Sequence, residues 1–235
     1  MNEAIILAGG LGTRLRSHVP DVPKCMAPVA GKPFLSYVID YYAGQGIASF
    51  VFALGYKSEM IIDYLVQEYP TLEKKYSIET ELLGTGGAIK LACGQSTADN
   101  LLVLNGDTIF RVDVNRLAAF HLAKNADCTL SLKPMHNFDR YGVVVVDDAQ
   151  RITRFNEKKF YASGLINGGV YALNRQRFLK EDLPQKFSFE KDYMEALFTS
   201  HEMYGQVQDE YFIDIGIPAD YDQAQIDFRA TDQSR

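Results

Sequence analysis

The chain has 235 residues, of which 47% are hydrophobic and 23% are charged, a composition typical of a globular protein that can bury a sizeable core. Its formal net charge is -6 at pH 7, and no cluster of Lys and Arg is present, which argues against a nucleic-acid surface because such a surface needs a basic face. No apolar run approaches the roughly 20 residues of a membrane-spanning helix. Three widely spaced cysteines, Cys25, Cys93 and Cys128, indicate neither a disulfide framework nor a zinc site and fit a reducing cytoplasm.

In the first half of the chain, predicted strands alternate with predicted helices. Short apolar runs predict buried strands over residues 3–8, 49–54 and 101–104. Helices are predicted over residues 34–43 and over residues 58–69, where Ser58 is the expected N-cap. This alternation is typical of parallel strands joined by crossover helices, and in such sheets ligands bind beyond the carboxyl ends of the strands.

The pattern changes after about residue 128, where the predicted strands follow one another closely. Residues 141–147 and 151–157 flank the turn "DDAQ" and predict a hairpin. Residues 218–229 predict a closing helix, and the polar tail "TDQSR" is expected to fray. No repeat or linker interrupts the sequence, so we expect a single domain over residues 1–235.

The histidines show no spacing typical of metal ligands. His121 and His201 lie in helical patterns, and we interpret both as exposed helix residues. The sequence therefore predicts no histidine-based metal site.

The stretch "LAGGLGTRLR", residues 7–16, is an apolar strand that breaks into glycines and ends in arginines. Gly9, Gly10 and Gly12 let the backbone approach a ligand and turn its N–H groups toward an anion, while Arg14 offers a permanently charged fork of donors. The loop lacks the lysine of the G-x-x-x-x-G-K-[ST] phosphate loop and the third glycine of G-x-G-x-x-G. A phosphate chain is the expected ligand, and a simple tight turn is the alternative.

Two aspartates follow predicted strands in separate motifs. Asp107 stands in "LLVLNGDTI" and Asp214 in "YFIDIGIPADY". Two carboxylates at neighbouring strand ends can share a magnesium ion whose other ligands are phosphate oxygens and water. The sequence therefore predicts an Mg2+ site at Asp107 and Asp214, with strand-end capping as the alternative.

The long stretch "AIILAGGLGTRLRSHVPDVPKCMAPVAGKPF" resembles the signature of the sugar-1-phosphate nucleotidyltransferases. The resemblance implies an α/β fold, a three-layer Rossmann-like sandwich with a mixed, mainly parallel central sheet of the GT-A-like kind. It implies that Arg14 and Lys24 are catalytic: Arg14 holds the phosphates that leave as pyrophosphate, and Lys24 contacts the reacting phosphate. Cys25 replaces the proline that usually follows this lysine, and we expect it to be inert.

A second glycine loop, "ELLGTGGAI", resembles the segment that lines the nucleotide base in this family. Glu81 can accept two hydrogen bonds from guanine, or it is a solvated carboxylate at a strand end. The nucleotide-binding residues implied by the two loops are Leu7, Ala8, Gly9, Gly10, Gly12, Thr13, Glu81, Gly84, Thr85 and Gly86.

Segments of the second half resemble the sugar-phosphate side of the same family. The sugar-phosphate-binding residues implied by them are Tyr141, Gly142, Glu157, Lys158, Asn167 and Gly168, and Asn105 from the first half is expected to join them. Lys159 stands where proline is common, so either lysine of the pair can point inward, and Tyr141 also suits a core position. In "FSFEKDYMEALF", Glu190, Lys191 and Asp192 either contact substrate or begin a helix. Residues 1–127 are expected to bind mainly the nucleotide and residues 128–235 mainly the sugar phosphate.

The resemblance implies attack of a sugar 1-phosphate on the α-phosphorus of a nucleoside triphosphate, with pyrophosphate as the leaving group and Mg2+ as cofactor. Within the family the motifs look closest to the guanylyltransferases that make GDP-activated heptoses, whose substrates are GTP and a heptose 1-phosphate and whose product feeds bacterial surface glycans. A mannose-1-phosphate guanylyltransferase, or a relative that uses CTP, dTTP or UTP, is an alternative.

A non-catalytic sugar-nucleotide-binding regulatory protein is the alternative of another class. A glycosyltransferase is disfavoured because Asp107 is followed by Thr108 and Ile109 rather than completing an Asp-x-Asp motif. The sequence leaves open whether the chain forms a homo-oligomer.

Overall fold

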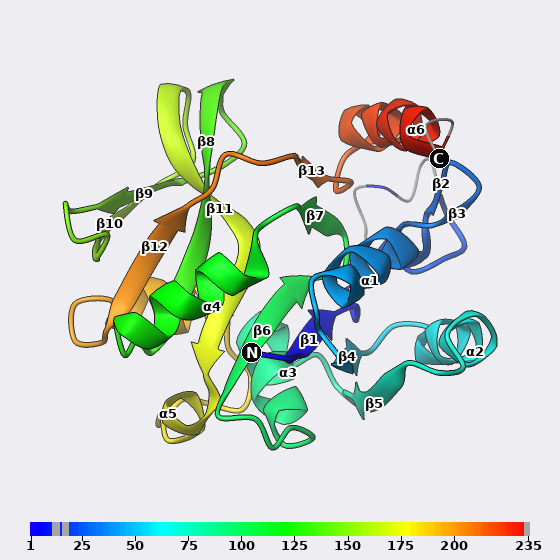
Figure 1. The fold of residues 1–235 in the computed structure, drawn as a ribbon, viewed down its shortest axis with the longest axis horizontal. Helices are drawn as coiled ribbons and strands as arrows, with labels where there is room; N and C mark the ends of the chain where they lie inside the picture. The colour runs from blue at the N-terminus through cyan, green and yellow to red at the C-terminus, as the bar shows by residue number, and fades with distance from the viewer. Residues whose placement is uncertain (11–14, 16–18, 233–235) are drawn as a thin grey trace.

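Four parallel strands form one side of the largest sheet in the structure, a computed structural model that describes residues 1–10, 15 and 19–232 (Figure 1). They run in the order β6-β1-β4-β5, with Ala4 opposite Phe50 on one side and Leu102 on the other. The apolar runs of β1, β4 and β6 are buried on both faces, as in strands covered by helices on both sides. The bounds are β1 (Glu3–Leu7), β4 (Ser49–Leu54), β5 (Glu73–Ile78) and β6 (Asn100–Asn105).

The second half of the chain extends this sheet with antiparallel strands. The long strand β11 pairs antiparallel with β6, β8 and β9, and β9 forms the predicted hairpin with β10. The sheet thus contains both parallel and antiparallel pairs, which confirms the expectation of a mixed sheet. Strand β12 pairs parallel with β8. The bounds are β8 (Cys128–Phe138), β9 (Val143–Val146), β10 (Ile152–Asn156), β11 (Tyr161–Asn174) and β12 (Met203–Val207).

Helices cover both faces of the sheet, which confirms the three-layer fold. Ile6 and Phe52 face one layer and pack with buried residues of α1, α2, α4 and α6. Ile5 and Val51, one residue away in each strand, face the other layer with α3, α5 and η2. The bounds are α1 (Phe34–Gly44), α2 (Ser58–Glu68), α3 (Gly84–Cys93), α4 (Val114–Ala123), α5 (Arg175–Leu179), the π-helical segment η2 (Phe189–Glu195) and α6 (Pro218–Asp232).

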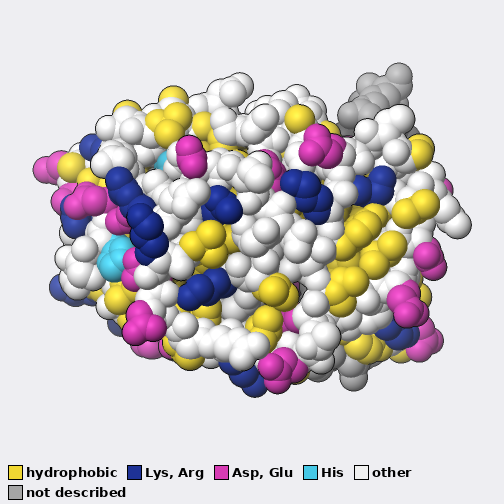
Figure 2. All heavy atoms as spheres, turned by 90° about the horizontal axis from the view of Figure 1, so that it is seen from below, with side chains coloured by type: hydrophobic (Ala, Val, Ile, Leu, Met, Phe, Trp, Pro, Cys, Tyr) yellow, Lys and Arg dark blue, Asp and Glu magenta, His cyan; other side chains and the backbone are white. Residues whose placement is uncertain are grey.

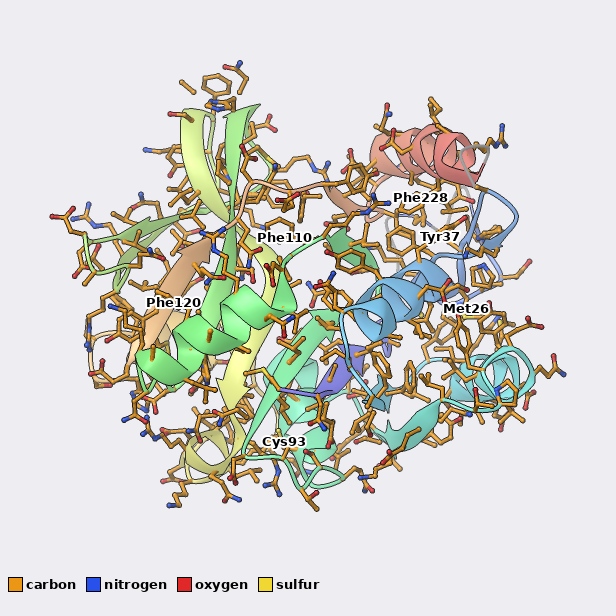
Figure 3. The ribbon with its side chains drawn as sticks, viewed as in Figure 1. Met26, Tyr37, Cys93, Phe110, Phe120 and Phe228 are labelled. Atoms are coloured by element: carbon orange, nitrogen blue, oxygen red, sulfur yellow. The ribbon has the colours of Figure 1, made fainter. Side chains whose placement is uncertain are left out.

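A second, two-stranded sheet joins the last part of the chain to the middle. Strand β13 (Phe212–Asp214) pairs antiparallel with β7 (Thr108–Phe110), and α6 then packs on α1, where the rings of Phe228 and Tyr37 have centroids 4.2 Å apart (Figure 3). This closing helix begins at Pro218, as predicted. Three further short elements follow the first glycine loop: η1 (Lys24–Met26), β2 (Pro28–Val29) and β3 (Lys32–Pro33).

Three local predictions were wrong. Ser58 is not an N-cap but the first residue of α2; Lys57 precedes it with a φ of 52°, and no side chain caps the helix. His121 is not exposed, because its ring lies between α4 and the sheet with only 1% of its surface accessible. His201 lies outside a helix and is half-buried, where it bonds to a carboxylate oxygen of Glu181 at 3.0 Å.

On the face drawn in Figure 2, basic side chains lie scattered among acidic ones rather than gathered in one block. Within the ranges that the structure describes, no helix is both long enough and apolar enough to cross a membrane. The three cysteines are buried free thiols. Most of the tail "TDQSR" lies outside the described residues.

Candidate active site

Two cavities with shared walls open at the carboxyl ends of the central strands. We call the cavity of about 570 Å³ cavity A and the cavity of about 510 Å³ cavity B. Leu7 and Asn105, the last residues of β1 and β6, line cavity A, as expected for a ligand site beyond the ends of parallel strands. The residues common to both cavities are Lys24, Asn105, Asp107 and Glu190.

Cavity A collects most of the residues predicted to bind a nucleotide. The predicted residues that line it are Leu7, Ala8, Gly9, Gly10, Gly84 and Thr85. Gly12, Thr13 and the predicted catalytic residue Arg14 lie outside the described residues. Gly86 is buried away from the cavity, where a Cβ would come within 2.2 Å of the ring of Phe187. Its role in the described structure is therefore close packing beneath the loop.

The second glycine loop is shaped by its contact with the segment before η2. Gly84 has a φ of 73°, and a Cβ there would lie 2.5 Å from the backbone oxygen of Phe187, so only glycine fits without strain. The N–H of Gly86 donates to that same oxygen at 3.0 Å. The loop is thus fastened to residues about 100 positions later in the chain, and helix α3 begins at the wall of cavity A.

Of the two glutamates that precede the second glycine loop, Glu79 and not Glu81 lines cavity A. Glu81 is exposed and is not part of the cavity wall. Glu79 is half-buried, its Oε2 accepts the N–H of Leu83 at 3.1 Å, and its Oε1 lies against the backbone of Gly9 and Gly55. Glu79 therefore connects both glycine loops, a position that the motif alone did not reveal.

Cavity B collects all the residues predicted on the sugar-phosphate side. They are Asn105, Tyr141, Gly142, Glu157, Lys158, Asn167 and Gly168. Lys158 lines the cavity, whereas Lys159 is absent from its wall and its Nζ lies 5.4 Å from the centroid of the Tyr161 ring. The sequence left open which of the two lysines points inward, and in the structure it is Lys158 that lines the cavity.

Lys24 lies between the two predicted metal-binding aspartates. Its Nζ donates to Oδ2 of Asp107 and, at 3.2 Å, to Oδ1 of Asp214. Burial lowers the pKa of Lys24, but the charges of both carboxylates more than offset this effect, so its pKa lies above the ordinary lysine value. Lys24 is therefore a fixed cation, and it stands where the two cavities meet.

The two aspartates fit a divalent metal in kind and placement. The β7–β13 pairing sets Asp214 opposite Thr108, the residue after Asp107, so that both carboxylates converge on one point. The N–H of Gly216 donates to Oδ1 of Asp214 at 2.7 Å, and a Cβ on Gly216 would come within 2.8 Å of that oxygen. Oxygen donors of this type suit hard cations such as Mg2+. Among the described residues, no group of three or more His, Cys, Asp and Glu side chains is arranged around a metal.

Cys25 lines cavity A in surroundings that disfavour its thiolate. Burial raises the pKa of its thiol to about 12, and the charge of Asp107 adds to this effect. The thiolate is the reactive form of cysteine. The expectation that Cys25 is inert therefore agrees with its surroundings.

The segment around the start of η2 lines the cavities with Glu190 and Lys191, whose role the sequence left open, and with Lys186, which the motifs did not single out. Lys186 lines cavity A, Lys191 lines cavity B, and Glu190 lines both. Asp192 has a structural role, because its Oδ2 accepts the N–H of Ser188 at 2.7 Å and so caps the segment. The single available signal was the stretch "FSFEKD", in which the sequence alone cannot separate a cap from a ligand-binding side chain.

Two cavities that meet at one fixed lysine beside a pair of aspartates are suited to holding two anionic ligands next to each other. The chain belongs to the nucleotidyl transferase family, whose model matches residues 3–231.

Relatives of known name cover nearly the whole chain. The D-glycero-alpha-D-manno-heptose 1-phosphate guanylyltransferase of Aneurinibacillus thermoaerophilus is 50% identical over 223 residues, which cover 95% of this chain and 96% of that protein. The protein of the same name from Campylobacter jejuni is 45% identical over 93% of this chain and 96% of its own length. The crystal structure of HddC from Yersinia pseudotuberculosis complexed with GMP-PN matches with a TM-score of 0.87 and 37% identity, over 97% of this chain and 100% of that chain.

Proposed function

We propose that this protein transfers the guanylyl group of GTP to D-glycero-α-D-manno-heptose 1-phosphate, giving the GDP-heptose and pyrophosphate. The observation that carries the proposal is the shared wall of the two cavities, where Lys24 and Asp107 are accessible from both sides. The two heptose-phosphate guanylyltransferases that are 50% and 45% identical to this chain support the choice of substrates.

Cavity A is the proposed nucleotide site and cavity B the proposed sugar-phosphate site. Glycine-loop backbone and the half-buried Glu79 suit a nucleotide in cavity A. Lys158 suits the phosphate of the sugar in cavity B, and Glu157 and Asn167 suit its hydroxyl groups. The α-phosphate of GTP then lies at the junction, within reach of Lys24.

The reaction needs no covalent enzyme intermediate. An oxygen of the sugar phosphate forms a bond to the α-phosphorus, the bond from that phosphorus to the bridging oxygen toward the β-phosphate breaks, and the electron pair leaves with pyrophosphate. The attacking phosphate oxygen is already ionised at neutral pH, so no general base is required. Lys24 stabilises the charge that develops on the α-phosphate, and we propose that Arg14 holds the leaving phosphates.

Mg2+ is the proposed cofactor, held by Asp107 and Asp214. When bound, it supplies positive charge that lowers the repulsion between the phosphates of the two substrates. The buried free thiols support a reducing compartment, and we propose the cytoplasm as the place of the reaction.

The test is pyrophosphate release with Mg2+ across a grid of GTP, CTP, UTP and dTTP against heptose 1-phosphate and mannose 1-phosphate. We expect release with GTP and the heptose phosphate at a kcat/KM at least about 10-fold above every other pair. A maximum with mannose 1-phosphate or with another nucleotide would reassign the substrate. Absence of release in the whole grid, from protein that still binds GTP, would leave the sugar-nucleotide-binding regulatory protein as the function.

A further inference from the structure

Glu190 occupies a position in the site that the proposed reaction does not use. It is half-buried, it belongs to the short segment η2, and it lines both cavities together with Lys24, Asn105 and Asp107. A carboxylate at the meeting point of two phosphate-binding cavities opposes the charge of both substrates. Its presence there needs an attractive interaction that compensates for this repulsion.

One oxygen of Glu190 is held in place by the protein. Its Oε2 accepts the hydroxyl proton of Thr85 at 2.8 Å and that of Ser188 at 3.2 Å. Thr85 gives its single proton to Glu190, and its Oγ1 accepts the N–H of Phe189 at 2.9 Å. The Thr85 hydroxyl is therefore already committed as a donor, and it fixes the direction of the Glu190 carboxylate.

The other oxygen of Glu190, Oε1, has no hydrogen-bond partner among the residues that the structure describes. Nor does the carboxylate belong to a metal-binding group of three or more side chains within these residues. An ionised carboxylate accepts hydrogen bonds and donates none. The ligand group that suits Oε1 is thus a neutral donor such as a hydroxyl.

The surroundings of Glu190 contain neutral polar groups on the side of cavity B. Tyr171 lines that cavity, and its hydroxyl oxygen accepts the N–H of Asn167 at 2.9 Å. Burial, and then the charge of Glu190, raise the pKa of Tyr171 well above its ordinary value, so the phenol stays neutral. Glu190 thus places a charged acceptor beside a neutral phenol in the wall of cavity B, a pairing suited to the hydroxyl groups of a sugar ring.

We propose that Glu190 is a specificity-determining residue whose free Oε1 accepts a hydrogen bond from a ring hydroxyl of a substrate at the junction of cavities A and B. The inference rests on the proposed function, because GTP and the heptose phosphate each carry ring hydroxyls. The hydroxyl belongs to the ribose of the nucleotide or to the sugar 1-phosphate, and the experiment separates the two sources.

The experiment compares the wild-type protein with Glu190→Gln and with the control Glu68→Gln, which removes an exposed carboxylate at the end of α2. Glutamine keeps the shape of Glu190 and an oxygen for Thr85, but it presents an amide donor in place of the free acceptor. One arm measures kcat/KM for GTP against its 2′-deoxy and 3′-deoxy analogues. The other arm measures kcat/KM for heptose 1-phosphate against its 2-deoxy analogue.

We expect the wild-type protein and Glu68→Gln to prefer the hydroxyl-bearing substrate by about 10-fold to 100-fold in one arm, because a hydrogen bond to a charged group is lost with the analogue. In Glu190→Gln, this preference falls to about 3-fold or less. A purely structural role for Glu190 would weaken hydroxyl and deoxy substrates equally, leave the ratio unchanged and overturn the proposal. A wild-type protein that shows no preference in either arm also overturns it, whether or not the variant folds.

Failure of the proposed function is recognised separately, as absence of pyrophosphate release by the wild-type protein. The same ratios are then measured as dissociation constants, by calorimetric titration of GTP, its deoxy analogues and the two sugar phosphates. A loss of hydroxyl preference in Glu190→Gln supports the role of Glu190, and an unchanged ratio overturns it.

Discussion

Nζ of Lys24 and Oδ1 of Asp214 lie 3.2 Å apart although 190 positions separate the two residues in the chain. The pairing of β13 with β7 brings them together, because it sets Asp214 beside the turn that carries Asp107. Lys24 therefore occupies the space on which both carboxylates converge, and a divalent metal at these carboxylates competes with the lysine for the same oxygens.

Replacement of Lys24 by methionine separates its two effects. We expect turnover to fall by about 100-fold or more, because the transition-state charge at the junction loses its fixed cation. We also expect Mn2+ to bind the nucleotide-free variant more tightly, since the competing ammonium group is gone. Pyrophosphate release measures the first effect and paramagnetic titration of Mn2+ the second. Lys32→Met, which removes a lysine paired with Asp40 outside the cavities, is the control, and weaker Mn2+ binding in Lys24→Met would contradict the competition.

Each of the two aspartates is expected to be needed for turnover and for metal binding. Asp107→Asn and Asp214→Asn should each lower turnover by about 100-fold or more and weaken Mn2+ binding, because a neutral amide oxygen is a poorer ligand for a hard cation. Removal of metal with EDTA should abolish turnover in the wild-type protein, and added Mg2+ should restore it. Near-normal rates in either variant, with thermal unfolding unchanged, would remove the metal role from that residue.

Base choice distinguishes Glu79 from Glu81. Glu79 lines cavity A and Glu81 does not, so Glu79→Gln should raise the KM for GTP by about 10-fold or more, through loss of a charged acceptor for guanine donors. Glu81→Gln is the matched control and should leave the KM for GTP within about 2-fold of the wild-type value. A larger increase of the KM for GTP in Glu81→Gln than in Glu79→Gln would indicate that Glu81 contacts the base.

Much of the site was predictable because it lies in contiguous motifs. Lys24, Asp107 and Lys158 stand in short segments whose glycines and strand ends are visible in the sequence, and the structure brings them to the cavity walls. Glu79 was missed because the motif draws attention to the nearer Glu81, and only the course of the chain after β5 turns Glu79 inward. Glu190 was left open because its hydrogen-bond partner Thr85 is 105 positions away.

Helical periodicity misled the interpretation of His121 for a related reason. Its position in α4 suits a polar exposed face, but its Nδ1 pairs with Thr129 at 2.9 Å and its Nε2 with Asn100 at 3.0 Å. Thr129 belongs to β8 and Asn100 to β6, so the sequence pattern of α4 alone could not predict these hydrogen bonds. A histidine that is satisfied on both ring nitrogens can be buried without a net charge.

This burial predicts a pH dependence of stability. Desolvation lowers the pKa of His121 to about 4 from its ordinary value of 6.5, so the unfolded chain takes up a proton at a higher pH than the folded chain does. The free energy of unfolding should therefore be fully retained above about pH 6.5 and fall as the pH drops toward about 4, by up to about 3 kcal/mol from this group.

Urea unfolding from about pH 7.5 to about pH 4.5 measures this contribution. The proteins compared are the wild type, His121→Gln and the control His136→Gln, which replaces an exposed histidine. His121→Gln should be less stable than the wild type at neutral pH, because its buried hydrogen bonds are altered. Since glutamine does not titrate, this variant should lose less free energy of unfolding over the acidic interval than the other two proteins. The same acid-dependent loss in all three would mean that the folded protein accepts a proton on His121 without cost, and the buried neutral imidazole would be disproved.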